Sequence, residues 1–129
     1  MARPMTGRPT DQELEILKVL WERGPSSVRD VWKVIAESRD VGYTSVLKIM
    51  QIMRDKGLVV CDVTQRPQLF RPRQSQQTTL RKLAGDLLQR VFGGSAQALL
   101  LHAIDPRSCS PEELSEIRAM LDQIERKGP

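Results

Sequence analysis

Two helix-start motifs of the same design lie near the N-terminus, and they restrict the fold more than any other feature of the chain. In Thr10-Asp11-Gln12-Glu13, and again in Ser27-Val28-Arg29-Asp30, a hydroxyl residue precedes a carboxylate by three positions. At a helix start this spacing lets each side chain satisfy a backbone N–H that has no partner inside the helix. Gly24-Pro25 separates the two motifs and ends the first helix. The N-terminal part is therefore predicted to contain short, separately capped helices.

Apolar residues follow each motif at the three- and four-residue spacing of an amphipathic helix. The apolar stripes of the first two helices are Leu14, Leu17, Leu20 and Trp21, and then Val28, Val31, Trp32 and Ile35. A third helix is expected from Tyr43 to Lys56, because Gly57 can close it. Its apolar face comprises Val46, Ile49, Met50 and Met53.

A hairpin is expected directly after the third helix. Residues 58–63 form a β-branched run, residues 64–67 a polar turn, and residues 69–71 a second short strand. Three short helices followed by a hairpin form a winged helix-turn-helix arrangement. The expected fold class is therefore mainly α, with a small β-hairpin wing in a winged helix-turn-helix DNA-binding domain, and with a further helical module after it.

Leucine-rich helices are expected after the hairpin. One ends at Gly93-Gly94, a strongly apolar one runs from Ser95 to Ile104, and a third begins at Ser110-Pro111. Such short helices gain stability mainly from packing, so their stripes are expected to meet those of a second copy in a homodimer. The alternative is a monomer in which residues 75–129 pack onto the N-terminal domain. The residues predicted at the dimer contact are Leu83, Leu87, Val91, Phe92, Leu99, Leu100, Leu114, Ile117 and Leu121.

The positive charge of the chain is concentrated in its N-terminal part. Residues 1–73 hold 13 Lys and Arg against nine Asp and Glu, whereas residues 74–129 hold seven of each. Within residues 41–73, six basic residues accompany two acidic ones. A local basic excess favours a polyanionic partner, because each neutralised phosphate releases condensed counterions. A solvated surface with a chance imbalance is the alternative interpretation.

The third helix has a polar face suited to the major groove of double-stranded DNA. Short polar side chains near the N-terminus of such a helix can approach base edges, and Gln51 can pair with adenine through two hydrogen bonds. Basic side chains and the Tyr43 hydroxyl would contact phosphates. An ordinary amphipathic helix with a solvated face is the alternative. The predicted DNA-binding residues are Tyr43, Thr44, Ser45, Lys48, Gln51, Arg54, Arg66 and Arg71.

These patterns divide the chain into three parts. Residues 1–9 are predicted to be a flexible basic arm, residues 10–73 a winged-helix DNA-binding domain, and residues 74–129 a helical dimerisation domain. The length of 129 residues is that of one small domain, or of a small domain with an appendage. Uninterrupted apolar runs extend over only three or four residues, so no membrane insertion is expected. The N-terminus lacks the apolar core of a signal peptide, so a cytoplasmic location is expected.

The sequence contains no recognisable catalytic motif, so an enzyme is not expected, and no cofactor is expected. No Gly-rich phosphate loop and no nucleophile elbow is present. His102 is the only histidine, and a pair with Cys61 would have no orienting third group. His102 and Cys109 supply two metal ligands at most, whereas a metal site needs about four. Both cysteines are expected to be free thiols.

Several ordered motifs together resemble a known family. They are Leu14-x-x-Leu17, Leu20-Trp21, Gly24-Pro25, Tyr43-Thr44-x-Val46, Lys56-Gly57-Leu58-Val59, Phe92-Gly93-Gly94-Ser95 and Ser110-Pro111-Glu112-Glu113-Leu114. Over about residues 9–127 the chain resembles the penicillinase repressor family, which includes methicillin-resistance and copper-transport operon repressors. The resemblance implies a homodimeric winged-helix repressor on a pseudo-palindromic promoter operator. It implies recognition-helix contacts at Thr44, Ser45 and Lys48, and a wing contact at Arg66.

Three departures from the family pattern affect what the resemblance implies. Leu47 and Ile52 stand where many members have basic residues, so the operator sequence does not follow. Antibiotic-responsive members are cleaved at an Asn-Phe bond by a membrane sensor protease, whereas this chain has His102-Ala103. The family resemblance therefore implies a membrane sensor protease as a partner, but the absence of the Asn-Phe pair argues against cleavage of this chain. Copper-responsive members carry paired C-terminal cysteines, whereas this chain has Cys109 alone, which argues against direct metal sensing.

Two other functions stay open at this point. The apolar Leu47 and Ile52 near the polar face of the third helix would suit a winged-helix adaptor that binds another protein. The other open function is nucleic-acid binding without sequence preference, either to double-stranded RNA or as an architectural DNA-binding protein. A steep salt dependence of binding to random duplex DNA would favour the nucleic-acid functions over the adaptor.

Overall fold

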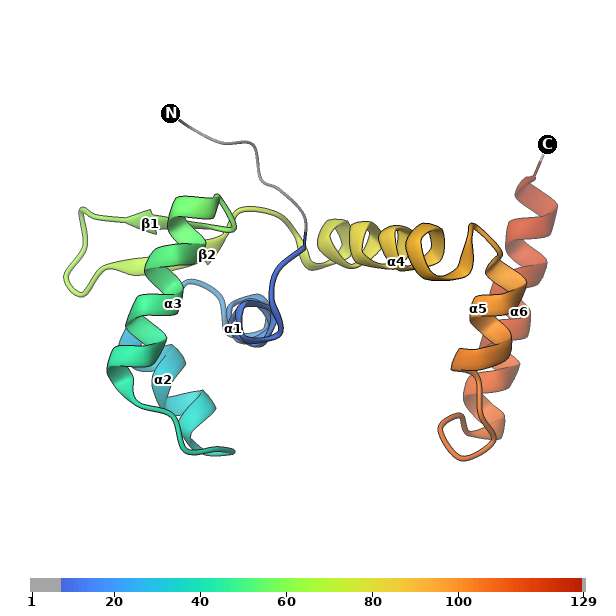
Figure 1. Cartoon of the computed structure of the whole chain (residues 1–129), viewed down its shortest axis with the longest axis horizontal. Helices are drawn as coiled ribbons and strands as arrows, with labels where there is room; N and C mark the ends of the chain where they lie inside the picture. Colours follow the sequence, from blue (N-terminus) through green and yellow to red (C-terminus); the bar gives the residue numbers. More distant parts are fainter. Residues whose placement is uncertain (1–7, 129) are drawn as a thin grey trace. The chain divides into compact units, whose positions relative to one another are not determined.

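A computed structural model describes residues 8–128, so most of the predicted arm at residues 1–9 lies outside the described residues. The N-terminal part contains the helices α1 (Asp11–Arg23), α2 (Val28–Ala36) and α3 (Tyr43–Lys56), and then the strands β1 (Val59–Asp62) and β2 (Leu69–Pro72) (Figure 1). The helices α4 (Gln76–Phe92), α5 (Ala96–Ala103) and α6 (Pro111–Lys127) follow. The predicted fold class, mainly helical with one hairpin wing, is confirmed.

Both predicted capping motifs form and set the starts of α1 and α2. The Thr10 hydroxyl accepts from the Glu13 N–H at 3.2 Å, and the Glu13 carboxylate accepts from the Thr10 N–H at 2.9 Å. Ser27 and Asp30 make the same reciprocal pair at 3.1 and 3.2 Å. Each pair satisfies donors that the first helical turn leaves free. Short-range hydrogen bonding therefore defines where both helices begin.

The backbone of the loop between α1 and α2 pairs with the hairpin as a third, one-residue strand. β1 and β2 pair antiparallel, with Cys61 opposite Phe70. The backbone of Ser26 then exchanges two hydrogen bonds with Phe70, of 3.0 and 2.8 Å. A two-stranded hairpin alone is marginally stable in water, so this extra pairing helps to hold the wing against the helices.

The hydrophobic core joins α1, α2, α3 and the hairpin. Its fully buried residues are Ile16, Leu17, Leu20, Val28, Val31, Ile35, Val46, Met50, Met53, Leu58, Val59 and Phe70. The predicted stripes of α2 and α3 are largely correct. The stripe of α1 differs, because Ile16 is fully buried whereas Leu14 and Trp21 are half-buried. Trp21 instead donates its indole N–H to the Gln74 carbonyl at 3.1 Å, which ties α1 to the chain after β2.

The chain divides into two compact units within α4, between Leu83 and Ala84. The sequence pattern placed the junction ten residues earlier, at 73/74. Trp21 donates to the carbonyl of Gln74, just before α4, and the Gln74 side chain accepts from Lys82 of α4 at 3.4 Å, so the start of α4 belongs with the N-terminal unit. Leu83, predicted at the dimer contact, thus belongs to the N-terminal unit. Of the described residues, no helix is long and apolar enough to cross a membrane.

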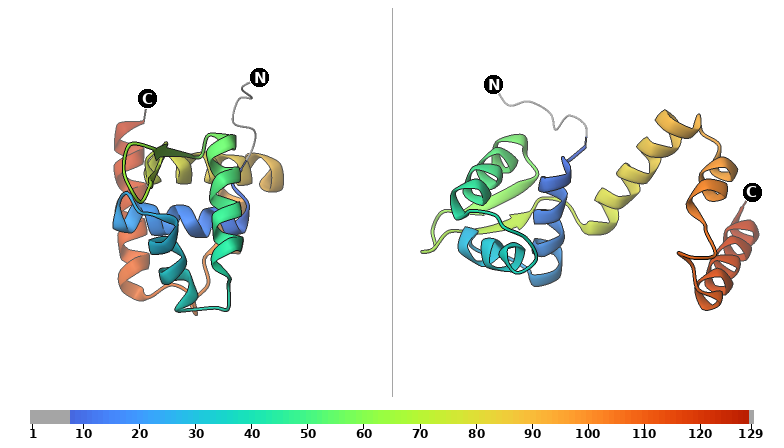
Figure 2. Two further views of the ribbon diagram at one scale, coloured as in Figure 1. Left: turned by 90° about the vertical axis from the view of Figure 1, so that its left-hand side faces the viewer. Right: turned by 60° about the horizontal axis from the view of Figure 1, so that its bottom comes forward.

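The unit that begins at Ala84 has no buried core of its own. Among its described residues, 84–128, none is fully buried, although its helices are rich in leucine and isoleucine. Figure 2 shows the short α5 between the longer α4 and α6. A serine hydroxyl caps each of the three helices: Ser75 accepts from the Thr78 N–H at 3.1 Å at the start of α4, and Ser95 caps α5. Ser110 caps α6 with Pro111 in the first turn, as predicted.

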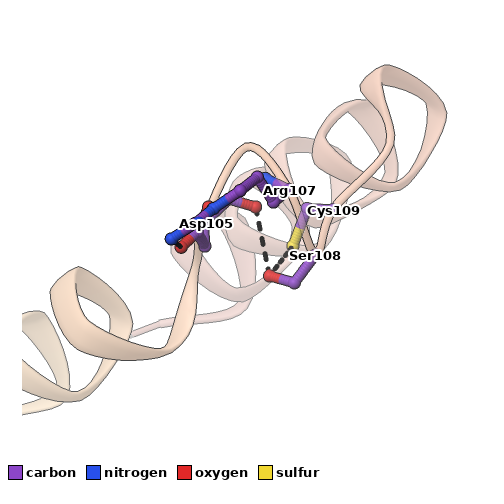
Figure 3. Close-up of polar contacts among 4 residues, drawn as sticks. All are labelled: Asp105, Arg107, Ser108 and Cys109. Carbon is purple, nitrogen blue, oxygen red and sulfur yellow. Dashed lines mark hydrogen bonds and ion pairs between the residues drawn. The ribbon is translucent and has the colours of Figure 1, made fainter.

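The loop between α5 and α6 is held by Asp105. Its carboxylate accepts from the Arg107 backbone N–H at 2.8 Å and pairs with the Arg107 guanidinium at 3.3 Å (Figure 3). These hydrogen bonds, the backbone one foremost, lower the pKa of Asp105. The Ser108 hydroxyl donates to the Asp105 carbonyl at 3.1 Å and lies next to the Cys109 thiol. The loop is therefore a hydrogen-bonded turn that leads directly into the α6 cap.

Candidate nucleic-acid interface

The core fixes which side of α3 faces solvent. Val46, Met50 and Met53 are buried at the centre of the domain. At about 100° per residue, the opposite side of the helix carries Thr44 and Lys48, both of which are exposed. Gln51, Arg54 and Ser45 are also exposed. Of the six DNA-binding residues predicted inside α3, Thr44, Lys48 and Gln51 therefore share the exposed face, and Tyr43, Ser45 and Arg54 are exposed on its flanks.

Aromatic contacts hold the N-terminal end of α3. The Trp32 indole N–H donates to the Val41 carbonyl at 2.8 Å, immediately before the helix. The Tyr43 ring packs edge-on against Trp32, with ring centroids 6.1 Å apart. Tyr43 keeps 39% of its surface exposed, so it is both anchored and accessible. A ring anchored in this way limits the freedom of the residues that begin the helix.

A groove runs between α3, the first turn of α2 and the turn of the hairpin. Its volume is about 380 Å³. Figure 1 shows α3 beside the hairpin, with which it is in contact. The residues that line it are Ser27, Val28, Arg29, Asp30, Tyr43, Leu47, Gln51, Arg54, Pro67, Gln68 and Phe70. Three predicted site residues, Tyr43, Gln51 and Arg54, therefore share a concave surface with residues of two other elements.

Arg66 lies at the hairpin turn, where it has a local role. Its guanidinium donates to the carbonyls of Val63 and Gln65, at 2.8 and 3.0 Å. The side chain is exposed, and these two bonds use one of its nitrogens. Arginine has five N–H donors, so the remaining ones stay available to a phosphate. Arg66 can accordingly brace the turn and contact a ligand at the same time.

Asp62 shapes the same turn from the end of β1. Its carboxylate accepts from the Thr64 hydroxyl at 2.6 Å and from the Thr64 backbone N–H at 3.0 Å. These hydrogen bonds, led by that of the hydroxyl, lower the pKa of Asp62, and the charge of Arg71 adds a smaller effect. Arg71 is exposed on β2, opposite Val60. The last predicted DNA-binding residue therefore lies on the wing, apart from the groove.

Residues outside the predicted set also belong to this surface. Arg29 is exposed in the first turn of α2, with its guanidinium carbon 5.7 Å from the centre of the Tyr43 ring. Sequence reasoning missed it because only the third helix and the hairpin were considered as ligand-binding elements. The available signal was an exposed arginine two positions after the Ser27 cap, on a helix whose apolar stripe leaves that side free. Leu47 and Gln68 also line the groove and were likewise not predicted as DNA-binding residues.

The residues predicted at a dimer contact are half-exposed or exposed. Val91 is 58% exposed, Leu121 48%, Leu87 41% and Leu100 38%. The half-buried members of the set are Leu83, Phe92, Leu99, Leu114 and Ile117. Further large apolar side chains outside the predicted set are also open to solvent, namely Leu80, Leu101, Met120 and Ile124. The accessible apolar surface thus extends beyond the residues predicted at the dimer contact.

His102 and the two cysteines lie in ordinary surroundings. The His102 ring packs against Phe92, with centroids 5.9 Å apart, and its Nδ1 lies 2.9 Å from the Ala98 carbonyl. Cys61 and Cys109 are both free and half-buried. Over residues 8–128, no three His, Cys, Asp or Glu side chains are grouped as a metal ion would require.

Comparison with known proteins decides the family of this chain. The family model of the penicillinase repressor matches residues 9–123. The chain belongs to the penicillinase repressor family. It is 29% identical over 117 residues to the transcriptional regulator BlaI of Mycobacterium tuberculosis, in both strain CDC 1551 and strain H37Rv, which covers 89% of this chain and 83% of BlaI. It is 19% identical over 114 residues to the penicillinase repressor of Bacillus licheniformis, which covers 88% of this chain and 89% of that protein.

Membership of the penicillinase repressor family gives the exposed face of α3 its context. The family consists of transcriptional regulators, so the chain is a DNA-binding transcriptional repressor and not an enzyme, as the sequence predicted. The match extends from before α1 into α6, so it includes both compact units. The fold and the class of function are thereby established together.

Proposed function

We propose that this repressor acts as a homodimer that binds a pseudo-palindromic promoter operator and excludes the polymerase. The single observation that carries the proposal is the exposed face of α3, where Thr44, Lys48 and Gln51 stand opposite the buried Val46 and Met50. A helix with one face fixed in a core and a polar opposite face fits the major groove as a rigid element.

The side chains on this surface divide into two roles. Thr44, Ser45 and Gln51 are the proposed base contacts, because short hydroxyl and amide side chains can hydrogen-bond to base edges. Lys48, Arg54, Arg66 and Arg71 are the proposed phosphate contacts, which supply affinity without sequence preference. The Tyr43 hydroxyl is a further phosphate donor. The exposure of all eight side chains supports the assignment.

The dimer is proposed on the apolar side chains of the C-terminal helices. None of the apolar side chains of residues 84–128 is fully buried, and Val91 and Leu121 are about half exposed. Solvent-exposed apolar surface of this extent favours association with a second identical surface. A two-fold dimer would then present two α3 helices to successive half-sites, about 34 Å or a multiple of it apart.

The route by which repression ends is a separate proposal. A membrane sensor protease is the partner that the family resemblance implies, yet the Asn-Phe pair is absent and His102-Ala103 stands in its place at the end of α5. We therefore propose that release does not depend on cleavage at this bond. The test is to incubate the protein with a sensor protease of the family and to map any new termini by mass spectrometry. A cut between His102 and Ala103 would contradict the proposal.

A DNA-binding and sedimentation experiment tests the function as a whole. In vitro selection from random duplexes with the full chain is expected to yield a two-fold symmetric site protected as a single footprint. Sedimentation is expected to give a mass of twice 14.6 kDa for the free protein. A protein that ignores duplex DNA at low salt, or that shows no salt dependence of binding, would instead favour the protein adaptor.

A further inference from the structure

Two arginines from different helices border the groove between α2, α3 and the hairpin turn. Arg29 comes from the first turn of α2, and Arg54 from the last turns of α3. Both are exposed. Within residues 8–128, the ion pair of Arg54 is a long one with Asp55, at 3.9 Å, and the Asp55 side chain is 76% exposed. Two guanidinium groups that share one concave surface are typical of a site for an anion.

Arg29 is held in place by a chain of contacts that begins in the backbone. Its guanidinium carbon lies 5.7 Å from the centre of the Tyr43 ring, within the range of a cation–π contact. Tyr43 packs edge-on against Trp32, and Trp32 donates to the Val41 carbonyl. The arginine is thus ordered before any ligand arrives, which reduces the entropic cost of binding.

The remaining polar groups of the groove are one carboxylate and several neutral groups. Asp30 offsets part of the positive charge, and its carboxylate accepts from the Ser27 N–H at the start of α2, so the two arginines leave the groove with a net positive charge. Gln51 and Gln68 supply neutral amide groups on the α3 and hairpin sides. The α2 helix starts at this groove, so the positive end of its dipole adds to the two guanidinium charges.

We propose that Arg29 and Arg54 clasp one backbone phosphate of the DNA duplex in this groove, with Tyr43 as the residue that positions Arg29. The inference rests on the proposed operator binding, and it adds α2 as a third DNA-contacting element beside α3 and the wing. The ligand is a phosphodiester oxygen pair, so the contact supplies affinity and register and leaves base preference to the exposed face of α3.

The first test measures affinity and its salt dependence for Arg29→Gln. The probe is a duplex of about 40 base pairs, selected in vitro for binding to the wild-type protein, which spans two half-sites. Binding is expected to weaken about five- to twenty-fold, and the slope of log K against log salt to fall by about 0.9 for each phosphate that is no longer neutralised. Lys18→Gln, on the exposed side of α1, removes the same charge outside the groove and is expected to change affinity less than about two-fold.

The second test identifies the phosphate itself. Single methylphosphonate substitutions along the probe each remove one phosphate charge. At one position per half-site, the substitution is expected to weaken binding of the wild type and of Lys18→Gln more than binding of Arg29→Gln, in which Arg54 alone remains at that phosphate. Equal sensitivity of all three proteins at every position would overturn the proposal.

The third test addresses the positioning by Tyr43. Arg29→Gln is expected to retain its full effect in a Tyr43→Phe background, which keeps the ring, and to lose most of it in a Tyr43→Leu background. Thermal unfolding of each variant confirms that it folds. If the wild type binds the probe while Arg29→Gln matches Lys18→Gln, the clasp is wrong and the operator proposal stands. If the wild type does not bind duplex DNA at all, both proposals fail.

Discussion

The ammonium group of Lys56, the last residue of α3, lies 2.8 and 2.9 Å from the two carboxylate oxygens of Glu13 in the first turn of α1. The Glu13 side chain is only 4% exposed, whereas that of Lys56 is 34% exposed. One carboxylate oxygen also accepts from the Thr10 N–H, so Glu13 caps α1 and anchors α3 at the same time. The C-terminal end of the DNA-facing helix is therefore tied to the start of the domain.

Removal of the Lys56 charge is expected to destabilise the domain. Lys56→Met keeps the alkyl chain and leaves a buried carboxylate without its cation, which costs about 1–3 kcal/mol in the free energy of unfolding. Urea unfolding followed by tryptophan fluorescence measures the change. Arg39→Gln is the matched control, because the Arg39–Glu15 pair is exposed and is expected to contribute much less. Equal losses of stability in the two variants would show that burial of Glu13 has no energetic consequence.

Loss of Lys48 is expected to weaken DNA binding while the fold and the dimer stay intact. Lys48→Ala removes one phosphate contact from the exposed face of α3, so affinity is expected to fall about three- to ten-fold and the salt slope by about 0.9. Fluorescence anisotropy titrations at two or more salt concentrations give both values. Lys33→Ala, exposed on α2, removes a charge away from α3 and serves as the control. An unchanged titration for Lys48→Ala would place the DNA-contacting face elsewhere.

The hairpin turn is expected to depend on the ionised form of Asp62. Its pKa is lowered in the folded protein, mainly by the Thr64 hydroxyl hydrogen bond. A lowered folded-state pKa means that the stabilisation is present above the unfolded-state pKa and is lost as the pH falls through the folded-state value. Carboxyl NMR titration is expected to give Asp62 a midpoint below the ordinary value. Thr64→Val should move that midpoint upward, and a midpoint that stays in place would rule out the hydroxyl as the cause.

A charge on the apolar face of α6 is expected to separate the dimer. Leu121→Glu places a carboxylate among apolar side chains at the proposed contact, and an unpaired buried charge costs several kcal/mol. Sedimentation of this variant is expected to show the 14.6 kDa chain at concentrations where the wild type is dimeric. Val63→Glu adds the same charge at an exposed apolar residue of the hairpin turn and is expected to leave the dimer intact. Dimers of unchanged stability for Leu121→Glu would move the interface to another surface.

The sequence by itself determined where the helices α1, α2 and α6 begin, because a helix start depends on groups a few residues apart. Thr10 with Glu13, Ser27 with Asp30, and Ser110 with Pro111 act within a single helical turn, and the structure contains all three starts. The apolar period of α3 likewise indicated which side is exposed, since Val46, Met50 and Met53 recur at helical spacing.

Tertiary structure alone decided which distant side chains meet. Nothing in the local pattern pairs Glu13 with Lys56, which lie 43 positions apart. Nothing places Arg29 over Tyr43, or buries Ile16 more deeply than Leu14. These relationships depend on how three helices and a hairpin pack around one core, and that packing is a property of all the elements together. The helix caps could be predicted from neighbouring residues, whereas the groove exists only once α2, α3 and the hairpin are assembled.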